Sequence, residues 1–272
     1  NQIYRSIDNA KTFSLIGEIN YVNDSAFGFT SNCKPLFYFA TNSGLYYTSD
    51  SGTTIKTGFP LYSFSPNGIA YGNGTWVTVG NSGGPSNNIY YSQDSSNWYL
   101  ASGDSFGGYG NKVAYANGKF IAVGYNGGFG ATIYSSTDGI NWSSNATTAT
   151  GELLSITYGP GVWITNDSTH VYISSDNGST WSSVALANSF NKIVYGDTTI
   201  AAANNGLFVS TDQGSSYLSI SASYSNMKSI VYGNGVYVAV GMSNSSNVAL
   251  RCSGYNTISY TLEPVVNQPN FT

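Results

Sequence analysis

The chain has 272 residues, of which only 8% are charged, and its formal net charge is -4. Its nine Lys and Arg residues are scattered and form no basic stripe, which excludes a nucleic-acid partner. No run of 18 apolar residues is present, so no membrane span is predicted, and the sequence shows no signal peptide. Since 41% of the residues are hydrophobic and 15% are aromatic, a packed core is expected rather than disorder.

One unit, seen at residues 170–181 as HVYISSDNGSTW, recurs along the chain. It consists of an extended apolar run, a Ser-x-Asp-x-Gly turn and a closing aromatic residue. The copies are marked by turn residues spaced 36 to 44 positions apart, namely Asp8, Asp50, Asp94, Asp138, Asp176, Asp212 and, in a degenerate seventh copy, Gly254. A period near 40 residues that is made of strands indicates the blades of a β-propeller.

A second hairpin precedes every turn of this kind except the first, that of Asp8. It joins two β-rich runs through a Gly-Asn-Gly type of turn, because such tight turns need the positive φ that Gly and Asn tolerate. Its copies lie at residues 69–80, 113–124, 156–165, 193–202 and 230–241, with a divergent copy at 26–40. The two hairpins together give four strands, which one repeat places near 112–115, 119–124, 131–135 and 141–144.

These hairpins predict an all-β fold, a β-propeller of four-stranded antiparallel blades. Seven blades are favoured by the number of Asp turns, and six are the alternative, since only six copies of the second hairpin are present. Residues 1–272 are predicted to form a single propeller domain that is part of a longer chain or a mature product. Its repeats lie near 1–16, 17–62, 63–104, 105–148, 149–185, 186–222 and 223–272. The tail 263–272 is a candidate to complete a seventh blade.

Two cysteines, Cys33 and Cys252, lie near opposite ends of the chain. The ends of a circular array are neighbours, so one interpretation is a disulfide that joins the two ends of the ring and stabilises it by closing a long loop. The alternative is a pair of buried free thiols. Two cysteines alone do not decide the redox compartment.

The motif Ser-x-Asp-x-Gly-x-x-Trp resembles the Asp-box of the bacterial-neuraminidase repeat (BNR), found in the sialidase-like superfamily of β-propellers. The resemblance covers nearly the whole chain and implies the fold. It leaves the function open, because such propellers include sialidases, other glycoside hydrolases, lectins and structural proteins. Sialidase sites in this superfamily have three arginines that hold the substrate carboxylate. Here the only arginines are Arg5 and Arg251, so sialidase activity is not expected.

The turn carboxylates are predicted to be structural, because an Asp in a hairpin turn accepts hydrogen bonds from the turn's own N–H groups. A glycoside hydrolase needs two carboxyl groups on one sugar bond, and the candidates for such a pair are Asp104, Glu152, Asp167 and Asp197. His170 is the only histidine, so no histidine-based zinc site or Ser-His-Asp set can be assembled. No metal and no cofactor are predicted.

The loops that vary between repeats are the candidate ligand-binding region; they include residues 81–88, 103–111, 125–130, 166–169 and 221–226. Aromatic rings among amide and hydroxyl groups are typical of surfaces that bind sugars or protein epitopes. The candidate ligand-binding residues are Tyr109, Tyr125, Phe129, Phe106, Tyr224, Asp104 and Asp167. The alternative is that these rings cap the core.

These observations favour a non-enzymatic recognition or adhesion module that is displayed outside the cell, on a cell surface or as a viral spike on a virion. Its expected partner is a glycan or a cell-surface protein, together with other subunits of a filament or virion. One alternative is a scaffold propeller whose faces hold only protein partners. The other is a glycoside hydrolase.

Overall fold

The computed structural model describes residues 2–5, 14–19, 21–58, 64–82, 88–128, 131–145, 147–203, 206–221, 224, 226–243, 246–253 and 261–264. All regular elements in this part of the chain are strands. The all-β prediction is confirmed. No helix that could cross a membrane is found in the described ranges.

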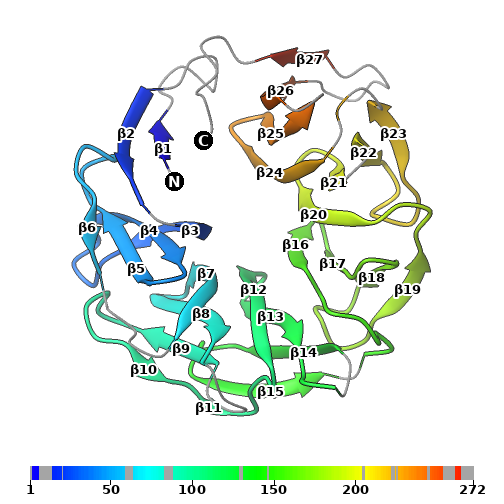
Figure 1. The fold of residues 1–272 in the computed structure, drawn as a ribbon. Coiled ribbons are helices and arrows are strands. Elements are labelled where there is room, and N and C mark those ends of the chain that lie inside the picture. The colour runs from blue at the N-terminus through cyan, green and yellow to red at the C-terminus, as the bar shows by residue number, and fades with distance from the viewer. Residues whose placement is uncertain are drawn as a thin grey trace.

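The strands form consecutive antiparallel sheets that follow one another around a ring (Figure 1). Two sheets lie early in the chain: β3 (Val22–Phe29), β4 (Pro35–Thr41), β5 (Gly44–Thr48), β6 (Lys56–Thr57), and β7 (Ser65–Gly72), β8 (Thr75–Asn81), β9 (Ile89–Ser92), β10 (Tyr99–Leu100). The next has five strands: β12 (Tyr109–Ala116), β13 (Lys119–Tyr125), β14 (Ala131–Ser136), β15 (Asn141–Asn145) and β11 (Ser102–Gly103).

Three further four-stranded sheets complete the array: β16 (Ser155–Gly159), β17 (Val162–Asn166), β18 (His170–Ser174), β19 (Ser182–Ala185); β20 (Phe190–Tyr195), β21 (Thr199–Ala203), β22 (Gly206–Ser210), β23 (Leu218–Ser221); β24 (Met227–Gly233), β25 (Val236–Ser243), β26 (Ser246–Ser253), β27 (Thr261–Pro264). The first strand of each sheet lies toward the centre of the ring and the fourth lies outside (Figure 1). A two-stranded sheet, β1 (Gln2–Arg5) and β2 (Ser14–Glu18), stands between the last sheet and the first (Figure 1).

The blade count differs from the expectation of seven, or alternatively six, complete four-stranded blades. Five sheets have four strands each. The sheet of β12–β15 gains β11 in parallel with β15, because the chain leaving β10 runs along the outer edge of the following sheet, where Ser102 N–H donates to Ile140 O and Asp104 N–H donates to Trp142 O. In the described residues the β1–β2 sheet has only two strands.

The core lies between adjacent sheets. Every residue of β17 and β22 is buried, as expected when a strand is covered on both faces by neighbouring blades. A repeated Tyr-Gly pair locks neighbouring inner strands together: a Cβ on Gly72 would overlap the ring of Tyr115, and one on Gly159 would overlap the ring of Tyr195. Only glycine leaves room for the aromatic ring of the following sheet.

The predicted link between Cys33 and Cys252 is not formed. Cys33 lies in the β3–β4 turn, where it is exposed and carries a free thiol, which also contradicts the alternative of a buried one. Cys252 lies on β26 and pairs with Tyr237. The sheet of β1 and β2 separates the first and last four-stranded sheets, so these two sheets are not direct neighbours (Figure 1).

Candidate functional site

The Asp turns that the structure describes join the third and fourth strands of their sheets, toward the outside of the ring. In the turn between β14 and β15, Asp138 Oδ1 accepts hydrogen bonds from Ile140 N–H and Asn141 N–H, both at 2.8 Å. The Ser136 hydroxyl donates to the same oxygen at 2.8 Å and accepts from Gly139 N–H. The turns of Asp50, Asp94, Asp176 and Asp212 have corresponding bonds. Asp8 lies outside the described residues.

A further partner of each Asp was not predicted. The second carboxylate oxygen accepts a side-chain hydrogen bond from a residue three or four positions later, which is Thr54, Asn97, Asn141, Thr180 or Ser216. These bonds favour the charged carboxylate. Backbone and side-chain donation from Asn97 lowers the pKa of Asp94 to about 2. Burial acts to raise the pKa of Asp138, but the hydrogen bonds from Asn141, Ile140 and Ser136 hold it at about 2.

Two of the predicted ligand-binding rings come together at the start of β12. The ring centroids of Tyr109 and Tyr125 are 5.6 Å apart, and both side chains are partly exposed. Burial raises the pKa of Tyr109, as do the charge of Glu152 and a hydrogen bond with it. Glu152 Oε1 accepts a second hydrogen bond, from Asn111 Nδ2 at 2.7 Å. We name Tyr109, Tyr125, Asn111 and Glu152 the tyrosine site.

The other predicted rings do not join this site. Phe106 was expected on a ligand-binding loop, but it is fully buried. It packs edge-on against Tyr134, with 4.7 Å between the ring centroids, since the chain around β11 folds over the sheet and turns this side chain inward. Tyr224 packs against the core of the last two sheets and is partly buried. Phe129 lies outside the described residues.

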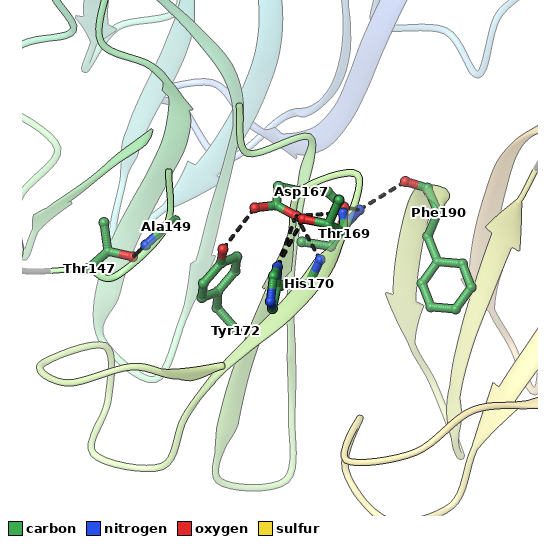
Figure 2. Close-up of polar contacts among 8 residues, drawn as sticks. Thr147, Ala149, Asp167, Thr169, His170, Tyr172 and Phe190 are labelled. Atoms are coloured by element: carbon green, nitrogen blue, oxygen red, sulfur yellow. Dashed lines mark hydrogen bonds and ion pairs between the residues drawn. The ribbon is translucent and has the colours of Figure 1, made fainter. Parts of the chain in front are cut away.

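Asp167 was also predicted to bind ligand, but it is only 2% exposed and both of its carboxylate oxygens accept hydrogen bonds (Figure 2). Oδ1 accepts from Thr169 N–H at 2.6 Å and from His170 N–H at 2.7 Å, and Oδ2 accepts from the Tyr172 hydroxyl at 2.7 Å. Burial acts to raise the pKa of Asp167, yet these bonds lower it overall. His170 remains partly exposed, and its Nδ1 lies 2.9 Å from Thr169 Oγ1. This cluster holds the β17–β18 turn.

The remaining candidate acids have separate partners. Asp104 lies at the outer edge of its sheet and accepts from Ser144 N–H and the Ser144 hydroxyl, at 2.9 and 2.8 Å. These bonds lower the pKa of Asp104. Asp197 accepts from the Tyr232 hydroxyl at 2.8 Å. Within the described ranges, no group of three or more His, Cys, Asp and Glu side chains is placed to hold a metal ion.

A series of amide side chains links each sheet to the next, four from inner strands and one, Asn166, from β17; it was not predicted from the sequence. Each Nδ2 group donates to a carbonyl at the equivalent position of the next sheet: Asn23 to Pro66 O, Asn67 to Gly110 O, Asn111 to Leu153 O, Asn166 to Phe190 O and Asn191 to Met227 O. The distances are 2.6 to 3.0 Å. We name these five bonds the asparagine links. Four donors precede the inner-strand apolar run by the same number of residues, which is a signal visible in the sequence.

One equivalent position on each inner strand is occupied in order by Asp24, Gly68, Lys112, Ser155, Lys192 and Ser229, and in four of the six strands it directly follows the donor of an asparagine link. Three of these residues carry charge, and we name Asp24, Lys112 and Lys192 the central charge cluster. Lys112 Nζ lies 3.1 Å from Asp24 Oδ1, and it also donates to Asn23 O at 2.9 Å. Gly68, on the strand between, lets Lys112 reach across because it has no side chain.

A groove of about 420 Å³ lies between the two-stranded sheet and β3–β5. Its lining includes Ile3, Phe37 and the exposed ring of Phe27. Arg5, also in the lining, donates from Nη1 to Ser51 O at 2.9 Å. The groove is therefore mostly apolar, with one charged side chain tied to an Asp turn.

The ring of antiparallel sheets, each with its first strand at the centre, defines a β-propeller. No protein-family model and no curated protein sequence matches the chain. Solved structures match it in fold. One, described as YCF48 bound to D1 peptide, has 13% sequence identity and a TM-score of 0.66 over 96% of this chain and 84% of that chain.

Two further structures have the same likeness. A nidogen/laminin complex matches with 14% identity and a TM-score of 0.60, over 76% of this chain and 82% of that chain. The computationally designed Ika8 protein matches with 8% identity and a TM-score of 0.64, over 91% of this chain and 77% of that chain. At these identities the likeness shows the β-propeller fold alone.

Proposed function

We propose that this β-propeller is a non-enzymatic recognition module that binds its partner at the tyrosine site. The observation that carries the proposal is the pair of Tyr109 and Tyr125, whose rings meet at an interplanar angle of 43°; the pair is partly exposed and hydrogen-bonded through Glu152 to Asn111. Flat rings offer contact area at low entropic cost, and the carboxylate and amide beside them can fix the orientation of a polar partner. A glycan or a protein loop has the mixed polar and apolar surface that this arrangement suits.

The similar propellers support this reading. Two of them were solved in complexes, one with a peptide and one between nidogen and laminin. For this chain we propose a glycan or a cell-surface protein as partner, and display outside the cell, on a cell surface or on a virion. The low fraction of charged residues suits such a surface. We further propose that the Asp turns are Asp-boxes of the BNR type and that β1–β2 begins a seventh blade.

The experiment compares two tyrosine pairs of similar tilted geometry. The Tyr109→Ala/Tyr125→Ala variant removes the site, whereas Tyr91→Ala/Tyr99→Ala removes a similar pair on β9 and β10, with centroids 5.8 Å apart. Labelled proteins are applied to a glycan array and to intact cells, with and without protease treatment. Binding is expected to fall at least tenfold in the first variant only. Equal binding by both variants, or no binding by the wild type to either target, would contradict the proposal.

A scaffold function is the second candidate, because the apolar groove next to the two-stranded sheet is a surface that another subunit can cover. Phe27 is 57% exposed there, and Leu15 on β2 is 51% exposed. Phe27→Asp would then prevent assembly with partner subunits, measured by the mass of the native particle, while the binding of glycans is unchanged. For a glycoside hydrolase no carboxylate pair facing one pocket is seen in the described residues, so we rank this function last.

A further inference from the structure

The central charge cluster has one more positive charge than it has partners for. Lys112 is paired with Asp24 at 3.1 Å, and both side chains are largely buried. Lys192 occupies the equivalent position on β20 and is partly buried, yet it forms no hydrogen bond or ion pair with another described residue. The carboxylate of Asp24 favours its charge electrostatically, and Lys112 opposes it. A partly desolvated ammonium group in this state gains energy from an additional anion.

The backbone beside the cluster adds hydrogen-bond donors. Ile69 N–H donates to Asp24 Oδ2, and Ile193 N–H donates to Ser155 Oγ, both at 3.1 Å. The N–H group that follows the central position therefore points toward the central residue of the preceding sheet. Where that residue is glycine or lysine, no side-chain acceptor exists. Val113 N lies only 3.1 Å from where a Cβ of Gly68 would be, so a side chain at position 68 would crowd this donor.

The charges also define the kind of anion. Two ammonium groups and one carboxylate leave a net charge of +1, which a monoanion neutralises and a dianion exceeds. Hydrogen bonds from a lysine ammonium group to a carboxylate oxygen are charge-assisted, and therefore shorter and stronger than bonds between neutral groups. The partial exposure of Lys192 leaves it within reach of solvent.

We propose that the centre of the ring is a binding site for a carboxylate, held between Lys192 and Lys112. The carboxylate belongs to an acidic sugar or to a peptide, and its oxygens accept hydrogen bonds from Lys192 Nζ. The Lys112 ammonium group attracts the ligand by its charge, because its three N–H groups already serve Asp24 Oδ1, Asn23 O and Asn67 O. Asp24 competes with the ligand for Lys112. The site is separate from the tyrosine site and does not depend on the proposed function.

Titration calorimetry with sodium glucuronate and with an N-acetylated dipeptide acid tests the proposal, and the uncharged amide of each probe serves as its control. At least one acid is expected to bind saturably, and its amide is not. Lys192→Gln should weaken binding at least tenfold, and Lys192→Arg should retain it. Asp24→Asn should strengthen binding because the competing charge is gone, an effect that a merely structural role of Asp24 does not produce.

Lys56→Gln, on the exposed outer strand β6, is the matched control and should bind like the wild type. Thermal unfolding of each variant confirms that it folds. Three results would overturn the proposal: neither acid binds, Lys192→Gln binds as tightly as Lys56→Gln, or sulfate binds more tightly than both acids, which would indicate a site for dianions. Preference for glucuronate or for the dipeptide acid identifies the source of the carboxylate.

Discussion

The Asp turns and the central charge cluster each occupy equivalent positions in successive sheets. The charges of the Asp turns are satisfied locally and in the same way in each turn, whereas those of the central cluster are not. In each described Asp turn a carboxylate accepts bonds from its own turn, with nearly the same partners every time. At the centre, the equivalent residue changes from sheet to sheet, and Lys192 has no ion-pair partner among the described residues. Residues that are the same in successive repeats stabilise the fold. Residues that differ from repeat to repeat at one equivalent position, such as those at the centre, make the charge of this ring specific to this protein.

The largest expected effect comes from Gly68→Ala, which disturbs the central region. An added Cβ would lie 2.8 Å from Lys112 Cα and 3.0 Å from Asn111 O, both parts of the main chain that cannot rotate away. Forcing the two inner strands apart is expected to lower the free energy of unfolding by about 1–3 kcal/mol, measured by denaturant titration. Gly233→Ala is the control, since nothing lies within 4 Å of its added Cβ. Equal losses in the two variants would show that β7 and β12 tolerate separation.

The next effect tests an Asp turn. Asp138→Ala removes the acceptor of bonds from Ser136, Ile140 and Asn141, and should lower the free energy of unfolding by about 1–2 kcal/mol. Asp138→Asn keeps an acceptor oxygen and should lose less. Asp104→Ala is the comparison on the same sheet, where the carboxylate accepts only from Ser144. If Asp104→Ala cost more than Asp138→Ala, the assignment of the Asp turns as fasteners of the sheets would be wrong.

The same turns predict how acid acts on the fold. The pKa values of Asp94 and Asp138 are lowered from 3.8 to about 2, so their contribution to stability is complete well above pH 4 and is lost as the pH falls toward 2. Thermal unfolding temperatures should therefore change little between pH 7 and pH 5 and fall steeply below pH 4. In Asp138→Ala this acid-induced fall should be smaller. If the unfolding temperature of Asp138→Ala fell as much as that of the wild type, groups other than Asp138 would cause the acid sensitivity.

The smallest expected effect is an increase in the free energy of unfolding, in contrast to the losses above. Desolvation, together with the charge of Lys112, lowers the pKa of Lys192, although Asp24 acts to raise it. A lowered pKa means that the charged form is less stable in the folded chain, so Lys192→Met should raise the free energy of unfolding by up to about 1 kcal/mol at pH 7. The gain should shrink at alkaline pH, as the wild type releases the proton. Lys56→Met should have no such effect, and destabilisation by Lys192→Met would contradict the prediction.

The sequence was sufficient for the hairpins and for the Asp turns, because both depend on contacts within a few residues. The strands predicted near 112–115 and 119–124 are found as Tyr109–Ala116 and Lys119–Tyr125. The turn bonds of Asp138 follow from the same local spacing. The side chain that donates to the second carboxylate oxygen, Asn141 in this turn, lies at a similarly regular spacing, but its bond was not predicted.

Contacts between sheets could not be predicted in this way. The asparagine links end on backbone carbonyls of the next sheet, and a carbonyl has no signature in the sequence. Phe106 was placed on a binding loop because glycines and serines surround it, yet the path of β11 turns it into the core. The pairing of Lys112 with Asp24, 88 positions earlier, depends on the packing of three consecutive sheets and on the missing side chain of Gly68.

The asparagine links also have a mechanical consequence. All five run in one direction, from each sheet to the next, starting at β3 and ending at β24. The two-stranded sheet lies between the first and last of the linked sheets (Figure 1). We therefore expect unfolding to begin at the two-stranded sheet and to proceed from there, one sheet at a time.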